Sequence, residues 1–301
     1  MFSSTYFKKK SKNRPEAITY PVDWPRPVKP GHSFPRKLND SVFELYSPEG
    51  GQKLDILFFH GLQIGSSRNA YLETWQSGSV CWPQNLLPMD FPRARILSIS
   101  YDSSARRSKV DGRVNLSQLG EVLLQDVVVS AAVGENCPVI LVGHSLGGIV
   151  IKQLCLEAEK HLRAHLIHRN KYVKKFMKNI KGIFYFSVPH GGSQLANLAK
   201  NYIPSPGPML DYLTVLSTHT EETNEDFVKL RSSYKWRAMA VSESLITRIG
   251  PFRAVVVTQE SASRDVDAFV LVEEDHISIC KPKSPEDASY VYFKNFVIEV
   301  T

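Results

Sequence analysis

A serine lies in the middle of the segment 138–150, which reads PVILVGHSLGGIV. The apolar, β-branched first half predicts a buried parallel strand, and the G-x-S-x-G pattern that follows predicts a sharp turn into a helix. Gly143 and Gly147 suit such a turn, because the chain passes so closely beside the serine that side chains have little room. The turn would lift the hydroxyl of Ser145 out of the sheet, which favours a nucleophile over a simple helix cap.

A nucleophilic serine needs a histidine that takes its proton and a carboxylate that orients the histidine. When the serine lies in a G-x-S-x-G turn, the order along the chain is serine, acid, histidine. His276 follows the last strand-like run, at 268–272, and is therefore the candidate general base. No metal and no cofactor are needed for this chemistry, and none is expected.

The acid is left open between two carboxylates. Glu243 comes directly after the strand-like run 236–241, and Glu260 comes after the run 253–257. Glu243 is preferred, because the run before it fits the strand whose end should carry the acid. Two further carboxylates stay open as alternatives, Asp265 and Asp275.

A second loop could complete the site. The strand-like run Leu54–Phe59 ends in a His-Gly pair, and the amide of Leu62 beyond it is a candidate donor to an oxyanion. The second candidate donor is the amide of Leu146, at the start of the helix after the serine. His60 is expected to form structural hydrogen bonds rather than to act as a base, and His60 and His190 are candidates for contacts with substrate.

Strands alternate with helices along the chain, which predicts an α/β fold with a mostly parallel central sheet flanked by helices. We expect one domain over residues 41–301, with a lid inserted at about 194–235, where prolines are frequent and strand character is absent. The aromatic residues Trp75 and Trp82 either line the mouth of the pocket or pack a loop onto the core.

Residues 1–40 are rich in proline, lysine and arginine, and we expect a flexible leader there. A transit peptide and a membrane-seeking arm are the alternatives for this segment. The net charge of +7 is not accompanied by a nucleic-acid-binding motif, so nucleic acid is not an expected partner. The basic residues of 160–178 are compatible with an anionic membrane surface or with a solvated helix face, and the oligomeric state is not predicted.

The four cysteines are scattered without a C-x-x-C spacing, which favours a reducing compartment over a disulfide framework. No apolar run reaches the roughly 18 residues that a membrane-spanning helix requires. We therefore expect an intracellular protein that is soluble or peripheral to a membrane, with mitochondria or the endoplasmic reticulum as candidate locations.

Four motifs of this chain occur together in one known family: the His-Gly pair at 60–61, GHSLGG at 143–148, VPHG at 188–191 and DHISICKP at 275–282. The chain thereby resembles the serine active site-containing protein family, related to GPI inositol-deacylase-like lipases, over residues 54–296. The resemblance implies an α/β-hydrolase fold and a serine esterase or lipase that acts on acyl esters, with phospholipids and glycolipids as candidates. It carries over Ser145 and His276, with the Leu62 and Leu146 amides, and it carries over the acid less clearly.

Two other functions use the same scaffold. A protein with this fold could bind a ligand or a partner with little turnover, because fold alone does not determine function. An acyltransferase would use the same residues and would replace water by another alcohol. The retained serine, acid and histidine favour hydrolysis.

Overall fold

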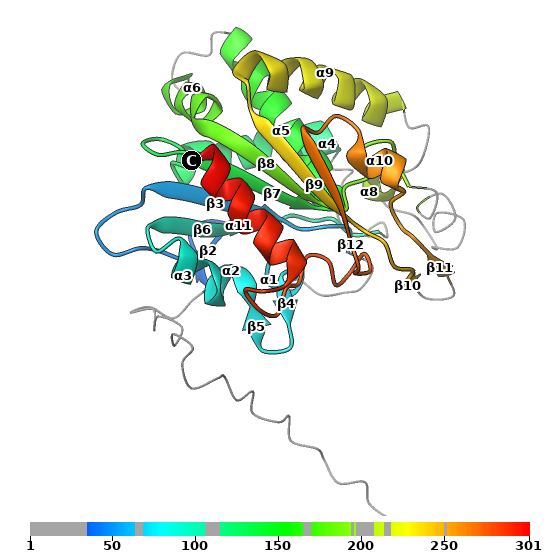
Figure 1. Ribbon diagram of the computed structural model, residues 1–301. Helices are drawn as coiled ribbons and strands as arrows, with labels where there is room; N and C mark the ends of the chain where they lie inside the picture. The colour runs from blue at the N-terminus through cyan, green and yellow to red at the C-terminus, as the bar shows by residue number, and fades with distance from the viewer. Residues whose placement is uncertain are drawn as a thin grey trace, which may run out of the picture.

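The structure is a computed structural model that describes residues 35–63, 69–105, 115–164, 170–193, 196, 208–213, 218–249 and 252–301. A central sheet of eight strands crosses the molecule (Figure 1). The strands are β1 (Arg36–Lys37), β2 (Val42–Tyr46), β3 (Leu54–Phe59), β6 (Ala94–Ile99), β7 (Val139–His144), β8 (Ile180–Phe186), β9 (Arg237–Glu243) and β12 (Ala268–Val272). Their order across the sheet is β1-β2-β6-β3-β7-β8-β9-β12.

The sheet is mostly parallel, as the sequence predicts. Only the pairs β1 with β2 and β2 with β6 are antiparallel, whereas β6, β3, β7, β8, β9 and β12 pair in parallel. Parallel strands end at the same edge of a sheet, so the loops after β3, β7, β8, β9 and β12 meet there. That edge is where the chemistry-bearing residues of the sequence come together.

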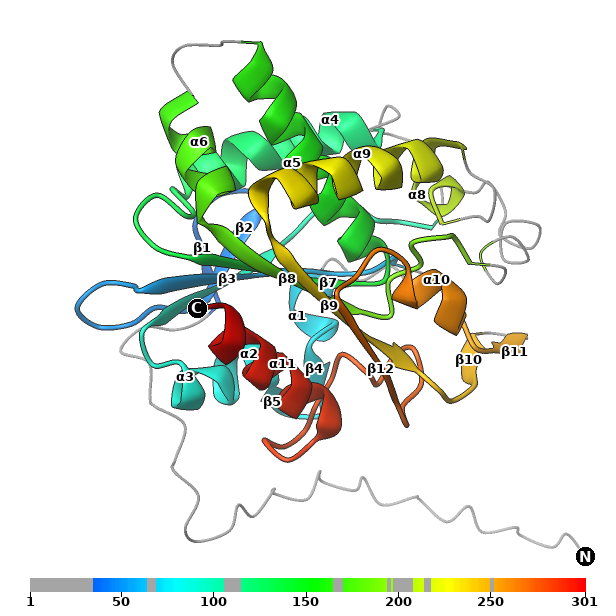
Figure 2. The ribbon, with the colours of Figure 1, turned by 45° about the horizontal axis from the view of Figure 1, so that its top comes forward.

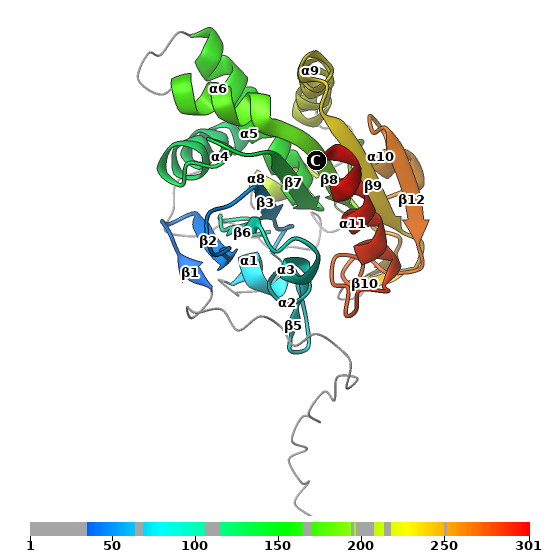
Figure 3. The same ribbon diagram turned by 60° about the vertical axis from the view of Figure 1, so that its left-hand side comes forward.

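Helices cover both faces of the sheet, which gives three layers (Figures 2 and 3). One face carries α4 (Leu116–Leu123), α5 (Leu146–Arg163), α6 (Asn170–Asn179) and α9 (Thr218–Tyr234). The other face carries α1 (Ala70–Glu73), α2 (Trp82–Asn85), α3 (Leu87–Asp90) and α11 (Ala288–Val300). The remaining short elements are β4 (Gln76–Ser77), β5 (Val80–Cys81), α8 (Pro208–Asp211), β10 (Thr247–Ile249), β11 (Phe252–Ala254) and α10 (Gln259–Ser263).

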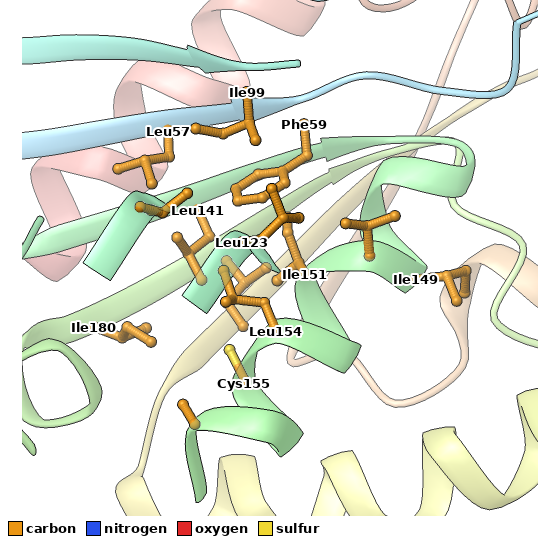
Figure 4. Packing of buried hydrophobic residues seen from close by; sticks show 14 of the residues in the cluster. Leu57, Phe59, Ile99, Leu123, Leu141, Ile149, Ile151, Leu154, Cys155 and Ile180 are labelled. Atoms are coloured by element: carbon orange, nitrogen blue, oxygen red, sulfur yellow. The ribbon is translucent and has the colours of Figure 1, made fainter. Parts of the chain in front are cut away.

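Strand β3 shows how the sheet separates two apolar cores. Successive side chains of a strand point to opposite faces, so an unbroken apolar run is expected where both faces are covered. Leu57 and Phe59 pack in the core beneath α4 and α5 (Figure 4). Phe58 packs in the other core, where its ring meets Trp75 and Trp82 edge-on. Both tryptophans are buried, so they pack their loop onto the sheet.

Residues 116–133 have amphipathic helical spacing, but the α-helix in this stretch ends early. Helix α4 begins with a capping box between Asn115 and Gln118 and ends at Leu123, and a π-helical segment, η1 (Leu124–Ser130), follows. Two residues that precede β2 hold this segment. The side chains of Asn39 and Ser41 donate hydrogen bonds to Asp126. The wider turn is thus fixed by tertiary contacts that the helical periodicity does not reveal.

One strand-like run of the sequence differs in its place. The run 253–257 does not join the central sheet, because β11 pairs with β10 in a separate two-stranded hairpin.

Most of the predicted leader and part of the predicted lid lie outside the described residues. At the end of the leader, β1 pairs with β2, so this part of 1–40 forms an edge of the sheet. Within the lid segment 194–235, the structure describes α8 and α9. Among the described helices, none is long and apolar enough to cross a membrane.

Candidate active site

Ser145 lies at the junction between β7, which ends at His144, and α5, which begins at Leu146. Its backbone has φ 51° and ψ −122°, a conformation that non-glycine residues rarely adopt. The Ser145 amide donates to the carbonyl of Phe186 at 3.0 Å, and the Ser145 carbonyl accepts from Gly148 at 3.1 Å. The strained turn is therefore held by the neighbouring strand and by the first turn of the helix.

The two glycines of the motif are required by close backbone contacts. A Cβ atom at Gly143 would lie 2.7 Å from the amide nitrogen of Gly148. A Cβ atom at Gly147 would lie 2.0 Å from the carbonyl oxygen of Phe59. Backbone atoms cannot move away as a flexible side chain can, so any larger residue at either position would distort the turn.

The loop after β3 passes directly beside the serine. A Cβ atom on Gly61 would lie 3.1 Å from the Cβ atom of Ser145. In the described part of the chain, we find no hydrogen bond donated by the backbone amide of Leu62 or of Leu146. Leu146 directly follows Ser145 and Leu62 directly follows Gly61, so both amides stay candidates for oxyanion donors.

His60 stabilises this loop through a hydrogen bond and a stacked ring. Its Nδ1 donates to the carbonyl of Gly61 at 3.0 Å, and its ring stacks on Tyr101 with centroids 4.1 Å apart. Burial lowers the pKa of His60 to about 4, against weaker opposing hydrogen bonds and the charge of Asp102. The neutral, enclosed ring fits the structural role that the sequence suggests, and the position gives no support to a contact with substrate.

Glu243 and His276 meet at the same edge of the sheet. Glu243 is the last residue of β9 and His276 follows β12, and these strands are neighbours. The Nδ1 atom of His276 lies 3.2 Å from Oε1 of Glu243, and both side chains are buried. The same oxygen accepts the backbone amides of Val256 and Val257, at 3.1 and 2.9 Å.

These bonds keep the carboxylate of Glu243 ionised. Burial alone would raise its pKa, but the hydrogen bond and charge of His276, together with bonds from Ser187 and Val257, lower it to about 2. An ionised carboxylate at Nδ1 accepts the Nδ1 proton, which leaves Nε2 of His276 as the basic atom.

A second histidine holds the backbone of His276. Nε2 of His144 donates to the carbonyl oxygen of His276 at 2.9 Å, and the two ring centroids are 4.9 Å apart. Burial and the nearby charge of His276 lower the pKa of His144 to about 3. Because His144 directly precedes Ser145, this contact brings the histidine loop to the serine turn. In the sequence, His144 is only the variable residue of G-x-S-x-G, and the motif indicates no role for it.

The other candidate acids lie elsewhere. Glu260 is exposed in the first turn of α10, and Asp265 is exposed after the same helix. Asp275 accepts the amides of Ile277 and Ser278 at 2.8 and 2.9 Å, which closes its own turn. Of the four carboxylates that the sequence leaves open, Glu243 alone has a hydrogen bond to His276 among the described residues.

His190 belongs to a different buried group. Nζ of Lys152 lies 2.6 Å from Nδ1 of His190, and it also donates to Oδ1 of Asn224. Asn224 in turn donates to the carbonyl of His190. Lys152 is only 1% exposed, on α5 two turns beyond Ser145. His190 is therefore enclosed between α5 and α9, and its position gives no support to a contact with substrate.

Burial shifts both titrating groups of this cluster towards their neutral forms. It lowers the pKa of Lys152 to about 7, and burial together with the Lys152 charge lowers the pKa of His190 well below its ordinary value. No local sequence pattern indicates this cluster, because a lysine that ends an apolar helical run normally lies at the surface.

A hollow of about 810 Å³ lies between the second half of α5 and α9, away from the serine turn. Its lining is charged and internally paired, as in the ion pairs of Lys160 with Glu157 and of Arg163 with Glu159. It therefore supplies no part of the Ser145 site.

The chain has the α/β-hydrolase fold. The mature form of the Bacillus licheniformis lipase BlEst2 matches 86% of this chain and 98% of its own, with a TM-score of 0.55 and 18% sequence identity. The chain is also similar to Protein SERAC1 of Danio rerio, with 30% identity over 270 residues that cover 81% of this chain and 39% of that protein. Protein SERAC1 of Homo sapiens is 28% identical over 290 residues, covering 87% and 42%.

The chain therefore spans about two fifths of the length of these curated relatives. No protein-family model matches the chain. These matches support the resemblance to α/β-hydrolases and to serine active site-containing proteins that the sequence motifs indicate. The likeness to GPI inositol-deacylases stays a prediction.

Proposed function

We propose that this chain is a serine hydrolase of carboxylic esters that uses Ser145 as nucleophile, His276 as general base and Glu243 as the acid that orients His276. The observation that carries the proposal is the 3.2 Å contact between Glu243 Oε1 and His276 Nδ1. A buried carboxylate at that nitrogen fixes the tautomer and stabilises the cation that forms when the histidine takes a proton.

The surroundings of Ser145 support the same chemistry. Its backbone, with φ 51°, has the strained conformation of a strand-to-helix turn that carries a nucleophile. His144 ties the histidine loop to this turn through the carbonyl of His276. The amides of Leu62 and Leu146 are available as oxyanion donors.

The reaction would then proceed in two steps. Nε2 of His276 takes the proton of Ser145 as the serine oxygen bonds to the ester carbonyl carbon, and the Leu62 and Leu146 amides stabilise the resulting oxyanion. The bond to the alcohol breaks, and the alcohol leaves with the proton from His276. Water gives a proton to His276 and attacks the acyl-enzyme, which releases the acid and restores the hydroxyl of Ser145.

Lipid esters are the substrate class that the sequence resemblance suggests, and we include them in the proposal. A series of esters of increasing acyl length, presented in solution and in vesicles, tests this part. Products formed with an added lysolipid acceptor separate hydrolysis from acyl transfer. An anionic membrane contact through residues 160–178, and association with mitochondria or the endoplasmic reticulum, stay predictions of the sequence.

Labelling with a fluorophosphonate probe tests the nucleophile, with hydrolysis of a short-chain ester measured in parallel. We expect the unaltered protein to be labelled and Ser145→Ala to be unlabelled, with an unchanged circular dichroism spectrum. The matched control is Ser263→Ala, which removes a serine hydroxyl from α10 and should keep full labelling. Absence of labelling in the folded, unaltered protein would contradict the proposal and favour a ligand-binding protein with little turnover.

A further inference from the structure

Exposed aliphatic side chains are concentrated around the Glu243–His276 pair. Eight large hydrophobic residues are exposed in the described part of the chain. Four lie in segments that follow or precede the acid and the histidine, namely Leu245 (45% exposed), Ile246 (65%), Val255 (37%) and Ile277 (48%). We call these four residues the apolar rim. The other four are spread over α4, β12 and α11.

Hydrogen bonds bring the segments of the apolar rim together. The amide of Leu245 donates to the carbonyl of Glu274 at 3.1 Å, and the amide of His276 donates to Oγ1 of Thr247 at 2.8 Å. The loop after β9 therefore lies against the loop after β12, which carries Ile277. Val255 joins the same region, because the next residue, Val256, donates its amide to Glu243.

The β10–β11 hairpin extends from the carboxyl edge of the sheet (Figure 2). Ile246 of the apolar rim directly precedes this hairpin, and Val255 directly follows it. Arg248 and Arg253 are directly opposite each other in this hairpin, and both are exposed. Opposed residues of an antiparallel pair project from the same face, where like charges repel. In the described part of the chain, neither arginine takes part in an ion pair. The paired charge is thus available to an anionic partner outside the chain.

We propose that the apolar rim and the Arg248–Arg253 pair form a surface that docks on an anionic lipid bilayer. Aliphatic side chains enter the boundary between headgroups and acyl chains, and arginines bind the lipid phosphates beside them. This inference rests on the proposed function in one respect, since docking here turns the Ser145 site towards the bilayer and delivers lipid esters to it.

Helix α6, within the basic stretch of 160–178, is a poorer match to a bilayer. Helix α6 exposes Lys171, Lys174 and Lys178, but its apolar residues Val173 and Phe176 are buried in the core. It can therefore attract anionic lipid without inserting an aliphatic side chain. The apolar rim combines both features, although Glu273 and Glu274 follow β12 close by and make its charge mixed.

The test uses protein that carries Ser145→Ala, so that binding is measured without turnover. Co-sedimentation is measured with vesicles of phosphatidylcholine, with and without phosphatidylglycerol. In this background, Ile246→Ser should weaken binding about tenfold through the loss of inserted apolar area. Arg248→Gln and Arg253→Gln should each weaken binding to the anionic vesicles about fivefold. Added salt should reduce the contribution of the two arginines to binding.

Two matched controls accompany these variants. Ile298→Ser changes an equally exposed isoleucine on α11 and should leave binding unchanged. The double variant Lys171→Gln/Lys174→Gln removes charge from α6 and should weaken binding less than the hairpin variants do. Loss of binding only in the α6 variant, or no binding of the parent protein to either vesicle, would overturn the proposal.

Failure of docking is distinguishable from failure of the proposed function. With Ser145 intact, Ile246→Ser and Arg248→Gln should keep the labelling and the short-chain ester activity of the unaltered protein, since both reactions occur in solution. Vesicle binding without labelling would leave the docking surface in place and refute the serine hydrolase. Circular dichroism of every variant checks that the fold is retained.

Discussion

Two histidines are buried at the same edge of the sheet, and they have opposite surroundings. His276 has the carboxylate of Glu243 at 3.2 Å from its Nδ1 atom, whereas His190 has the amine of Lys152 at 2.6 Å from the same ring atom. They follow β12 and β8, which are separated in the sheet by β9 alone. The two sites thus share a fold position and a degree of burial, and they differ in the charge that faces Nδ1.

The difference determines what each ring can do. A carboxylate accepts the Nδ1 proton, leaves Nε2 basic and stabilises the cation that a general base must become. Burial lowers the pKa of His190 well below its ordinary value, and the charge of Lys152 lowers it further, because an amine that donates to Nδ1 opposes that cation. Burial of a histidine is therefore no sign of catalysis until its partner is known.

The largest expected effect comes from removing each histidine in turn. His276→Ala should lower kcat for a short-chain ester at least about 10⁴-fold, because the serine loses its base. His190→Gln, which can still accept from Lys152, should keep kcat within about threefold and lower the free energy of unfolding by about 1 kcal/mol. Steady-state kinetics and urea unfolding measure the two effects, and equal losses of kcat would remove the distinction between the sites.

The next effect concerns the carboxylate of the pair. Glu243→Gln keeps the size of the side chain and removes the charge that fixes the His276 tautomer, so kcat should fall about 10³-fold. Glu260→Gln, in the exposed first turn of α10, is the matched control and should leave kcat unchanged. If the Glu260 variant has the larger loss, the acid has been assigned to the wrong strand end.

A smaller effect is expected at His144, which positions His276 through its carbonyl oxygen. His144→Leu removes the donor and should lower kcat about tenfold to a hundredfold, since small displacements of a catalytic group are that damaging. His144→Gln retains an N–H donor and should recover most of the loss, with KM unchanged in both. An equal loss in the two variants would indicate a packing role alone.

The smallest expected effect is a dependence of the free energy of unfolding on pH that arises at Lys152. Burial lowers the pKa of Lys152 from 10.5 to about 7, so between these values the unfolded chain binds more protons than the folded one. The free energy of unfolding should therefore rise with pH above about 7, by roughly 1 kcal/mol per pH unit. Below that pH, Lys152 contributes no slope, because it is protonated in both states.

Urea unfolding at pH values of about 7, 8 and 9 measures this slope. Lys152→Met should reduce it, while labelling by a fluorophosphonate probe persists. A slope that is the same in the variant would show that Lys152 is not the titrating group.

The sequence predicts the central part of the site because its signals are local. The serine turn is marked by the closely spaced Gly143 and Gly147, although the contact that requires Gly147 comes from the distant Phe59. The strand-like runs 54–59, 236–241 and 268–272 lie within two residues of β3, β9 and β12, since an apolar run covered on both faces has a distinct composition. His276 is predicted only from the order serine, acid, histidine along the chain.

The rest depends on contacts between distant segments. Glu243 and Glu260 each follow a strand-like run, and only the pairing of β9 with β12, rather than with the run at 253–257, separates them. Lys152 appears in the sequence as the polar end of an apolar helical run. Its partners come from the loop after β8 and from α9, and no local pattern announces them.

The contact between His144 and His276 also has a consequence for folding. These residues are 132 positions apart in the chain, and the parallel strand pairs around them join residues 29 (Met239 and Ala268) to 84 (Asp55 and Val139) positions apart. Helices form from local contacts, whereas such long-range pairings are late and slow. A refolding chain should thus regain most of its helical signal before it regains a reactive serine, and labelling would report the completion of folding rather than its onset.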